Sequence, residues 1–144
     1  MPVPSLKPCP FCAIAGGIAS AELVYEDAAC VAFLDRSPLA IGHALLIPRV
    51  HVETIFDADA ATLTALALAT QRLAVAVKAA MEADGVFVAQ NNVVSQSVPH
   101  LHVHVVPRRF KDGLFTRGMV WRRVKYDGPA QMAEVAAAIR SASA

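Results

Sequence analysis

The sequence predicts an α+β fold in which an antiparallel sheet of five to six strands is covered by one long helix and one C-terminal helix. Two observations support this prediction. Short apolar segments bounded by turn residues recur along the chain, as they do in the strands of an antiparallel sheet. A long segment rich in Ala, Leu, Gln, Arg, Lys and Met, which favour helix, separates two groups of these strands at residues 59–83.

The size and composition of the chain limit what it can be. With 144 residues it is long enough for one core and too short for two, so residues 1–144 are expected to form a single domain. The net charge is only +1, which argues against a nucleic-acid partner and against a basic membrane-binding surface. No 18-residue apolar run and no signal-peptide pattern are evident, so we expect a cytoplasmic protein with no membrane partner.

The N-terminal half contains the first predicted strands. Residues 1–8 hold three prolines and are expected to be extended or flexible. Residues 23–25 and 30–34 are apolar and separated by a turn-like segment, so they predict a hairpin. Residues 44–47 predict a third strand, and Gly42 before it allows a tight entry or a close approach of the backbone to a ligand.

The helix predicted at residues 59–83 can be capped by Asp57 or Asp59 and ended by Gly85. Its apolar side chains recur at helical spacing, so one face is expected to cover the sheet. The residues on that face are Leu63, Leu66, Leu73 and Val77.

The remaining elements follow this helix. Residues 86–89 and 101–106 predict a fourth and a fifth strand, and residues 121–124 are the candidate for a sixth. A final helix is expected to begin near Pro129, because proline is favoured at the first helical position. Its apolar side consists of Met132, Val135 and Ile139.

Three of the five histidines occupy alternate positions in the run His-Leu-His-Val-His-Val-Val at positions 100–106. Alternate side chains of an extended strand share one face, at a spacing of roughly 6.6 Å, so the histidines should form a row. Imidazole suits nucleophilic or proton-transfer chemistry near neutral pH, but two histidines at i and i+2 can also bind one zinc ion. A purely structural row would need a polar partner for each buried ring.

The three cysteines are an odd number, which argues against a disulfide framework. Cys30 lies in an apolar strand and is expected to be a buried, inert thiol. Cys9 and Cys12 form a Cys-x-x-Cys pair, which is compatible with redox chemistry or with a metal site. A redox role would require the cysteines to lie at the start of a helix, and the proline-rich N-terminus does not predict that setting.

A polar loop at residues 91–99 leads into the histidine run. Its hydroxyl and amide groups suit the oxygens of a phosphate, although simple turn chemistry also accounts for Asn and Ser at these positions.

The run at 100–106 resembles the signature of the histidine-triad (HIT) superfamily of nucleotide hydrolases and transferases. Three further segments resemble that family in the same order: Phe-Leu-Asp-Arg-Ser-Pro at 33–38, Gly-His-Ala-Leu-Leu-Ile-Pro-Arg at 42–49 and Gln-Ser-Val-Pro at 96–99. The resemblance extends from about residue 9 to residue 107 and implies a HIT-like fold, with residues 109–144 as a C-terminal extension.

The resemblance implies catalytic roles for four residues. His102 matches the histidine that attacks the α-phosphate of a nucleotide and forms a covalent nucleotidyl-histidine, which water then resolves. His104 and His43 match phosphate-binding positions, and Ser97 matches a residue near the leaving group, where its hydroxyl can pass a proton.

It also implies residues that bind the nucleotide. Asp35 matches a ribose-binding position, and the side chains that resemble the apolar walls of the purine pocket are those of Phe11, Ile14 and Phe33, for which ordinary core packing is an equally good explanation. Arg36 stands where many relatives have an aliphatic residue. Asn91 and Gln96 match phosphate contacts, although the loop is shorter than in many relatives, and Gln90 or Asn92 could replace Asn91.

A branch of the same family binds structural zinc through two cysteines and two histidines, which correspond here to Cys9, Cys12, His51 and His100. Such a closed tetrahedral site would hold the N-terminus against the histidine run. Free thiols are the alternative. With zinc bound, the first histidine of the run would serve the metal and the other two the phosphate.

The activity implied by the resemblance is cleavage of a P–O or P–N bond at a purine nucleoside α-phosphate, in nucleoside phosphoramidates or dinucleoside polyphosphates. One alternative is a nucleotide-binding or interaction module with little turnover, and another is a metallohydrolase in which the histidine row holds a catalytic zinc. Relatives in this branch form homodimers that pair their long helices, which implies a homodimer here, although the apolar stripe of residues 59–83 fits an intrachain core equally well. In some relatives the segment equivalent to basic residues 110–126 reaches the partner's active site, but a solvated surface strand is at least as good an explanation here.

Overall fold

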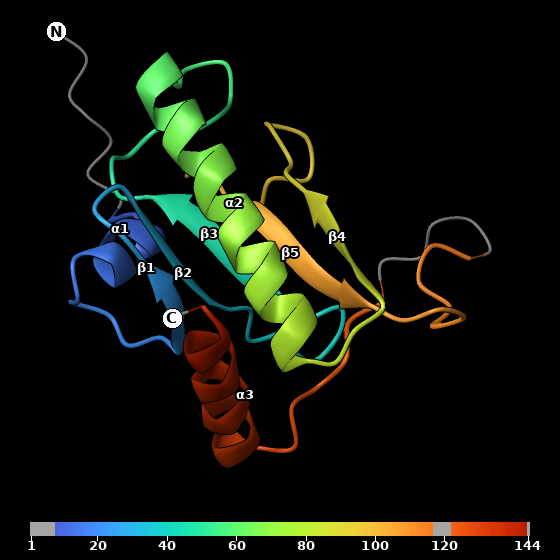
Figure 1. Cartoon of the computed structure of the whole chain (residues 1–144). Coiled ribbons are helices and arrows are strands. Elements are labelled where there is room, and N and C mark those ends of the chain that lie inside the picture. The colour runs from blue at the N-terminus through green and yellow to red at the C-terminus, as the bar shows by residue number, and fades with distance from the viewer. Residues whose placement is uncertain (1–7, 117–121, 144) are drawn as a thin grey trace, which may run out of the picture.

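The protein was analysed as a computed structural model, which describes residues 8–116 and 122–143. Five strands and three helices follow one another in this part of the chain (Figure 1). All neighbouring strands are antiparallel, and their order in the sheet is β1-β2-β3-β5-β4. The predicted α+β fold is therefore confirmed, with five strands. The elements are α1 (Pro10–Ala15), β1 (Leu23–Glu26), β2 (Cys30–Leu34), β3 (Ala44–Pro48), α2 (Ala60–Ala80), β4 (Gly85–Ala89), β5 (Val103–Arg108) and α3 (Pro129–Ala142).

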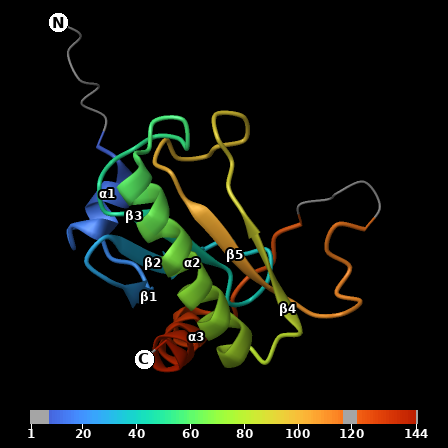
Figure 2. The same cartoon turned by 45° about the horizontal axis from the view of Figure 1, so that its top comes forward.

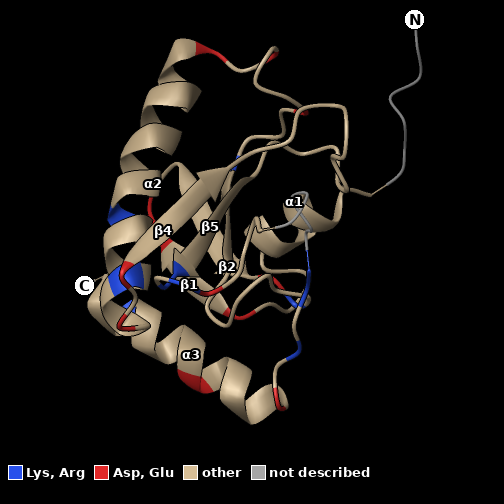
Figure 3. Ribbon diagram, turned by 90° about the vertical axis from the view of Figure 1, so that its right-hand side faces the viewer, with Lys and Arg blue, Asp and Glu red and all other residues tan. Residues whose placement is uncertain are grey.

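Strands β2 and β3 are buried along their whole length, because both faces of the sheet are covered there. Side chains alternate between the faces: Ala32 and Leu46 pack toward α2 and α3, whereas Phe33 and Leu45 pack toward α1. Figure 3 shows α2 and α1 on opposite sides of the sheet. The sheet therefore separates a large core on the side of α2 from a smaller one on the side of α1.

Helix α2 begins where the sequence predicts. The Asp59 side chain accepts a hydrogen bond from the backbone N–H of Thr62, which caps the helix. The helix ends at Ala80, however, with Met81 as its C-cap, and Gly85 instead starts β4. Leu66, Leu73 and Val77 are buried against the sheet as predicted, and Leu63 is half-buried.

The composition of α2 departs from one expectation. By length and composition it could cross a membrane, since an 18-residue window has a mean hydropathy of 1.5, so the sequence does contain such an apolar segment. Of that window, 28% is buried inside the fold. The helix packs on the sheet and beside α3 (Figure 2), so the fold covers one of its faces.

The local structure differs from the predictions in two places. Residues 122–124 form no strand, and the sixth strand is therefore absent from the described residues, with Trp121 lying outside them. Helix α1 was not predicted; Pro10 starts it because proline lacks the N–H that a first helical position leaves unpaired. The expectation for residues 1–7 also lies outside the described part of the chain.

Gly42 is required for packing. Its φ is +98°, and an added Cβ would lie 2.7 Å from Cγ of Met81. The Met81 side chain, just after α2, therefore lies in close contact with this glycine.

Candidate functional site

The histidine run forms the predicted row, although β5 begins only at Val103, so His100 and His102 precede the strand. The ring centroids of His102 and His104 lie 5.1 Å apart, on the α1 side of the sheet. Leu101, Val103 and Val105 point the other way, into the core beneath α2. The predicted alternation of faces is therefore confirmed.

A further histidine, which lies just before β3, joins this row. His43 is buried, and its Nε2 lies 2.9 Å from Nδ1 of His104. The backbone N–H of Leu39 donates to Nδ1 of His43 at 3.0 Å. Because Nδ1 of His43 accepts, a neutral ring carries its proton on Nε2 and donates it to His104. That arrangement places the proton of a neutral His104 on its own Nε2.

Burial keeps these rings neutral. It lowers the pKa of His43 to about 3 and that of His104 to about 4, although the Asp35 carboxylate opposes both changes. Burial also lowers the pKa of His102. Imidazoles in this region therefore act near neutral pH as donors and acceptors of defined direction, and not as cations.

His102 is oriented by the backbone. Its Nδ1 lies 2.7 Å from the carbonyl oxygen of His100, which can only accept, so Nδ1 carries the proton. Phe11 packs against the ring edge-on, with centroids 5.1 Å apart. Nε2 of His102 therefore keeps its lone pair, which is the requirement for a nucleophile or a base.

Asp35 closes the other side of the row. Its Oδ1 accepts from the backbone N–H of Ser37, and its Oδ2 accepts from Nη1 of Arg123 at 3.1 Å. The same Oδ2 lies 3.7 Å from Nε2 of His43. Asp35, His43 and His104 lie close enough to hold a metal, but a ligating Nε2 of His43 would have to lose the proton that it donates. The hydrogen bonds therefore favour a polar cluster without a metal here.

These groups open onto a pocket of about 1000 Å³ between α1, the sheet and the start of α3. Seven of the residues predicted to be catalytic or nucleotide-binding line it: Phe11, Ile14, Phe33, Asp35, Ser97, His102 and His104. His43 lies behind His104 and is not part of the wall. The pocket is within the size range of small-molecule sites.

Two predicted phosphate contacts do not reach this pocket. The amide of Gln96 donates to the carbonyl of Glu53 at 2.6 Å and accepts from the N–H of Val93, so it closes its own loop. Asn91 is half-buried and is likewise absent from the described pocket wall. The alternative Asn92 is also engaged, because its Oδ1 accepts from the N–H of Ile55. The side chains of Asn92 and Gln96 therefore stabilise the local backbone, which agrees with the turn role considered for the polar loop as the alternative to phosphate binding.

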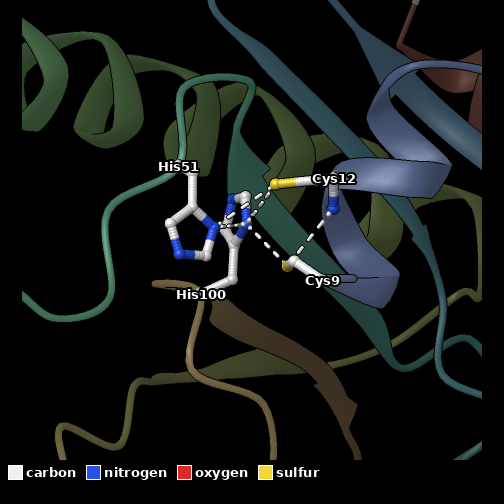
Figure 4. Close-up of side chains that lie close together, drawn as sticks. All are labelled: Cys9, Cys12, His51 and His100. Atoms are coloured by element: carbon white, nitrogen blue, oxygen red, sulfur yellow. Dashed lines mark hydrogen bonds between the residues drawn. The ribbon is translucent and has the colours of Figure 1, made fainter. Parts of the chain in front are cut away.

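A second cluster lies at the far end of the histidine row and consists of Cys9, Cys12, His51 and His100 (Figure 4). We refer to it as the Cys–His cluster. Nδ1 of His51 and Nδ1 of His100 are 3.2 Å apart, and three sulfur–nitrogen distances lie between 3.3 and 3.6 Å. A tetrahedral zinc site requires about 3.3 Å between two nitrogens and about 3.5 Å between nitrogen and sulfur. The donor set and its geometry therefore fit zinc.

The protonation of His100 supports this fit. Its Nε2 lies 2.9 Å from the carbonyl oxygen of Pro48, so Nε2 carries the proton and Nδ1 presents a lone pair to the cluster. The sulfurs of Cys9 and Cys12 and Nδ1 of His51 all lie within 3.6 Å of this nitrogen. Its single lone pair cannot accept a hydrogen bond from all three. A shared cation would satisfy all of them.

The cysteine pair lies in a setting that the sequence did not predict. Cys9 is the N-cap of α1, and its sulfur accepts from the N–H of Cys12 at 3.4 Å. The cysteines therefore do lie at a helix start, as a redox pair would. With two histidines completing a tetrahedron, metal binding fits these four residues better than redox chemistry.

Sequence reasoning assigned no site role to several residues of the pocket. Arg123, Lys125, Tyr126 and Met132 line it from the C-terminal part of the chain. The only sequence signal was the basic composition of residues 110–126, for which a role in the partner's site and a solvated strand were the two alternatives. In the structure, Arg123 and Lys125 line the pocket of the chain's own site.

A profile of the family described as HIT domain matches residues 17–111 of the sequence. An uncharacterized HIT-like protein from Mycobacterium tuberculosis strain H37Rv is 39% identical over 119 residues, which cover 81% of this chain and 83% of that protein.

Two solved structures share the fold. A zinc-bound histidine triad family protein from Mycobacterium smegmatis is 34% identical, with a TM-score of 0.81, over 94% of this chain and 92% of the other. A hypothetical histidine triad nucleotide-binding protein from Sulfolobus tokodaii strain 7 is 31% identical, with a TM-score of 0.82, over 94% and 91% of the two chains.

Proposed function

The chain belongs to the HIT domain family, whose members bind nucleotides, and we propose that it is a hydrolase or nucleotidyltransferase acting at the α-phosphate of a purine nucleotide. The observation that carries this proposal is the orientation of His102. It lines the pocket, and its Nδ1–H is held by the His100 carbonyl at 2.7 Å. A neutral imidazole in this tautomer has its nucleophilic nitrogen defined before substrate binds.

In the first step, Nε2 of His102 forms a bond to the α-phosphorus while the P–O or P–N bond to the leaving group breaks. The leaving group takes a proton, for which the hydroxyl of Ser97, exposed and at the pocket wall, is positioned to serve. In the second step, water attacks the nucleotidyl-His102 intermediate, its oxygen replaces Nε2 on phosphorus, and the proton that it releases restores the Ser97 hydroxyl. Nucleoside monophosphate leaves and His102 returns to its neutral state.

His104 and His43 would stabilise the charge on the phosphate. The protonated Nε2 of His104 can donate to a phosphate oxygen, while its Nδ1 is held by His43. His43 does not line the pocket, so in this proposal it acts by positioning His104. Donors that packing holds in place need no reorganisation during the reaction. This preorganisation is usually the largest contribution to the rate enhancement at such sites.

The nucleoside would occupy the apolar part of the pocket. Phe11 and Phe33 pack edge-on with centroids 5.2 Å apart, and both are almost fully buried, so they contribute to the core as well as to the wall. Ile14 lines the same wall. Asp35 lies at the edge of the pocket, where its carboxylate oxygens can accept from ribose hydroxyls.

The Cys–His cluster would hold a structural zinc ion. Bound there, zinc would act as a crosslink between α1, the loop after β3 and the residue that orients His102. Within the described residues the cluster shares no member with the pocket wall, which weighs against a metallohydrolase that uses the histidine row.

We also propose a homodimer. Leu68 and Val75 lie seven residues apart on the outer face of α2 and are 52% and 63% exposed. Besides these, the outer face presents mainly small or uncharged residues, with Arg72 and Lys78 the only charges of the helix, as the blue bands on α2 in Figure 3 illustrate. A second copy of the chain would cover this apolar surface.

The test is turnover by a His102→Asn variant, which keeps a polar side chain of similar size. We expect release of AMP from adenosine 5′-phosphoramidate or a diadenosine polyphosphate to fall by on the order of 10³-fold or more, with unchanged thermal unfolding. Wild-type protein quenched in alkali, where a phosphorus–nitrogen bond of histidine survives, should carry an adenylyl group on His102 by mass spectrometry. Near-normal turnover by the variant would refute the mechanism. Binding of AMP without turnover by the wild type would support the binding-module alternative.

A further inference from the structure

The segment of residues 122–128, which we call the C-terminal strap, leads into α3 and is fastened to the loop that carries Asp35 and His43 (Figure 1). The N–H of Val124 donates to the carbonyl of Pro38 at 2.7 Å. The N–H of Gly42 donates to the hydroxyl of Tyr126 at 3.1 Å. These bonds lie on either side of Lys125 and directly follow Arg123, so the backbone of both cations is held at the pocket wall.

Arg123 uses only part of its guanidinium in this arrangement. Its Nη1 donates to Oδ2 of Asp35 and to the carbonyl oxygen of Ser37. Among the described residues, Nε and Nη2 have no hydrogen-bond partner. The side chain is 41% exposed and lines the pocket. A guanidinium presents its N–H groups as a planar fork, so those on Nε and Nη2 remain to bind a ligand oxygen.

The charge around this part of the pocket is positive. Arg36, Arg123 and Lys125 line it, against Glu22 and Asp35. Asp35 is paired with Arg123, and the only hydrogen bond of the Arg36 side chain within the described residues is a donation to the carbonyl of Ser20. The ammonium of Lys125 has no partner in the described part of the chain. The pocket therefore offers more cationic donors than the α-phosphate, which the histidines would bind, requires.

We propose that Arg123 is a specificity residue that binds a second phosphate of the nucleotide, an inference that rests on the nucleotide site proposed above. With Nη1 on Asp35, the remaining N–H groups can pair with two oxygens of one phosphate, and Lys125 adds charge beside them. The nucleotide site proposed above puts Asp35 at the ribose, so a phosphate on the 2′ or 3′ oxygen that Asp35 does not bind is one source of this group. A second phosphate in the 5′ chain is the other source.

Equilibrium binding separates these sources. AMP, adenosine 2′,5′-bisphosphate, adenosine 3′,5′-bisphosphate and ADP would be titrated calorimetrically into the wild type, Arg123→Ala and Arg123→Lys. We expect at least one of the ligands with two phosphates to bind the wild type about tenfold tighter than AMP, an advantage that Arg123→Ala removes. Arg123→Lys should keep part of it, because a point charge remains without the fork. The ligand that shows the advantage identifies the source.

The readout is the ratio of the affinity for each ligand to the affinity for AMP. A substitution that weakens the binding of all the nucleotides equally leaves this ratio unchanged. Arg122→Ala is the matched control, because Arg122 is exposed and is not among the residues that line the pocket. The advantage should also shrink as salt is raised, since Arg123 is partly exposed. Equal ratios in the wild type and Arg123→Ala would overturn the role of Arg123 alone. A wild type that does not bind AMP would overturn the nucleotide site and this inference together.

Discussion

His43 and His104 form a hydrogen bond of 2.9 Å whose direction is set by a third group. The backbone N–H of Leu39 occupies Nδ1 of His43, so the proton between the rings belongs to His43. His104 comes from β5 and His43 lies just before β3, and these two strands pair with each other. The tautomer of a residue at the pocket wall is therefore set by the loop before β3.

Acid should destabilise the protein through these rings. In the unfolded chain both histidines titrate near pH 6.5, whereas burial lowers their pKa to about 3 and about 4 in the fold. Below pH 6.5 the unfolded state therefore binds more protons, so the stabilising contribution is complete above that pH and is lost as pH falls toward 4. Each ring should contribute up to about 1.4 kcal/mol per pH unit, measured by urea unfolding between pH 7.5 and 4.5.

His43→Gln should reduce the steepness of that dependence, because one of the buried rings no longer titrates. The comparison of variant with wild type isolates the ring from any loss of metal, which acid would cause in both proteins. Identical slopes of stability against pH would show that His43 is not neutral in the fold.

Gly42→Ala should destabilise the protein by roughly 2–4 kcal/mol. The residue has a φ of +98°, which an alanine adopts at a cost, and the new Cβ would lie 2.7 Å from Cγ of Met81. In a Met81→Ala background the packing part should vanish and leave about 1–2 kcal/mol from the backbone. Chemical unfolding of the four proteins of this cycle measures both parts. An equal effect of Gly42→Ala in the two backgrounds would exclude the contact with Met81 as its cause.

The predictions from sequence were accurate for elements that are determined by residues close to one another in the chain. Residues 30–34 are apolar without interruption because β2 is buried on both faces, and its predicted bounds agree with the structure. Asp59 caps α2 through a bond to Thr62, three residues away. The alternation of His104 with Val103 and Val105 follows from the pleat of any strand.

What the sequence did not predict depends on distant or very short interactions. Helix α1 has six residues, too few for a periodic pattern, and it is stabilised by the cap at Cys9. Arg123 is 88 residues from Asp35, so only the fold brings them together. The amide of Gln96 is bonded to the carbonyl of Glu53, 43 residues away, an interaction that no local sequence pattern indicates.

Val75→Glu should convert the proposed dimer into a monomer. The Val75 side chain is 63% exposed in the single chain, so a charge there should not destabilise the fold. In an apolar interface the same charge would be buried without a partner. Sedimentation velocity at several protein concentrations measures the assembly. Ala138→Glu, on the exposed face of α3, is the control that should leave it unchanged. A monomeric wild type would refute the dimer.

The Cys–His cluster should bind about one zinc ion per chain, and removing it should lower the melting temperature. Without the metal, two imidazole nitrogens 3.2 Å apart face two thiols, and burial and the neighbouring Cys9 raise the pKa of the Cys12 thiol. Without metal the protonated thiol is therefore favoured, whereas zinc favours the thiolates, because it binds them and releases their protons. Elemental analysis of protein purified without chelator, followed by thermal unfolding with and without chelator, tests both expectations.

Cys12→Ser and Cys30→Ala form the matched pair for this test. Cys12 contributes a sulfur to the cluster, whereas Cys30 is fully buried in β2, where burial raises its pKa to about 11. Cys12→Ser should lose the zinc, and its melting temperature should no longer respond to chelator, while Cys30→Ala keeps both properties. Because the cluster includes His100, whose carbonyl holds His102, zinc loss should also slow turnover without changing which residue is modified. Wild-type protein free of zinc, with two reactive thiols and an unaltered melting temperature, would show that the four residues do not hold a metal.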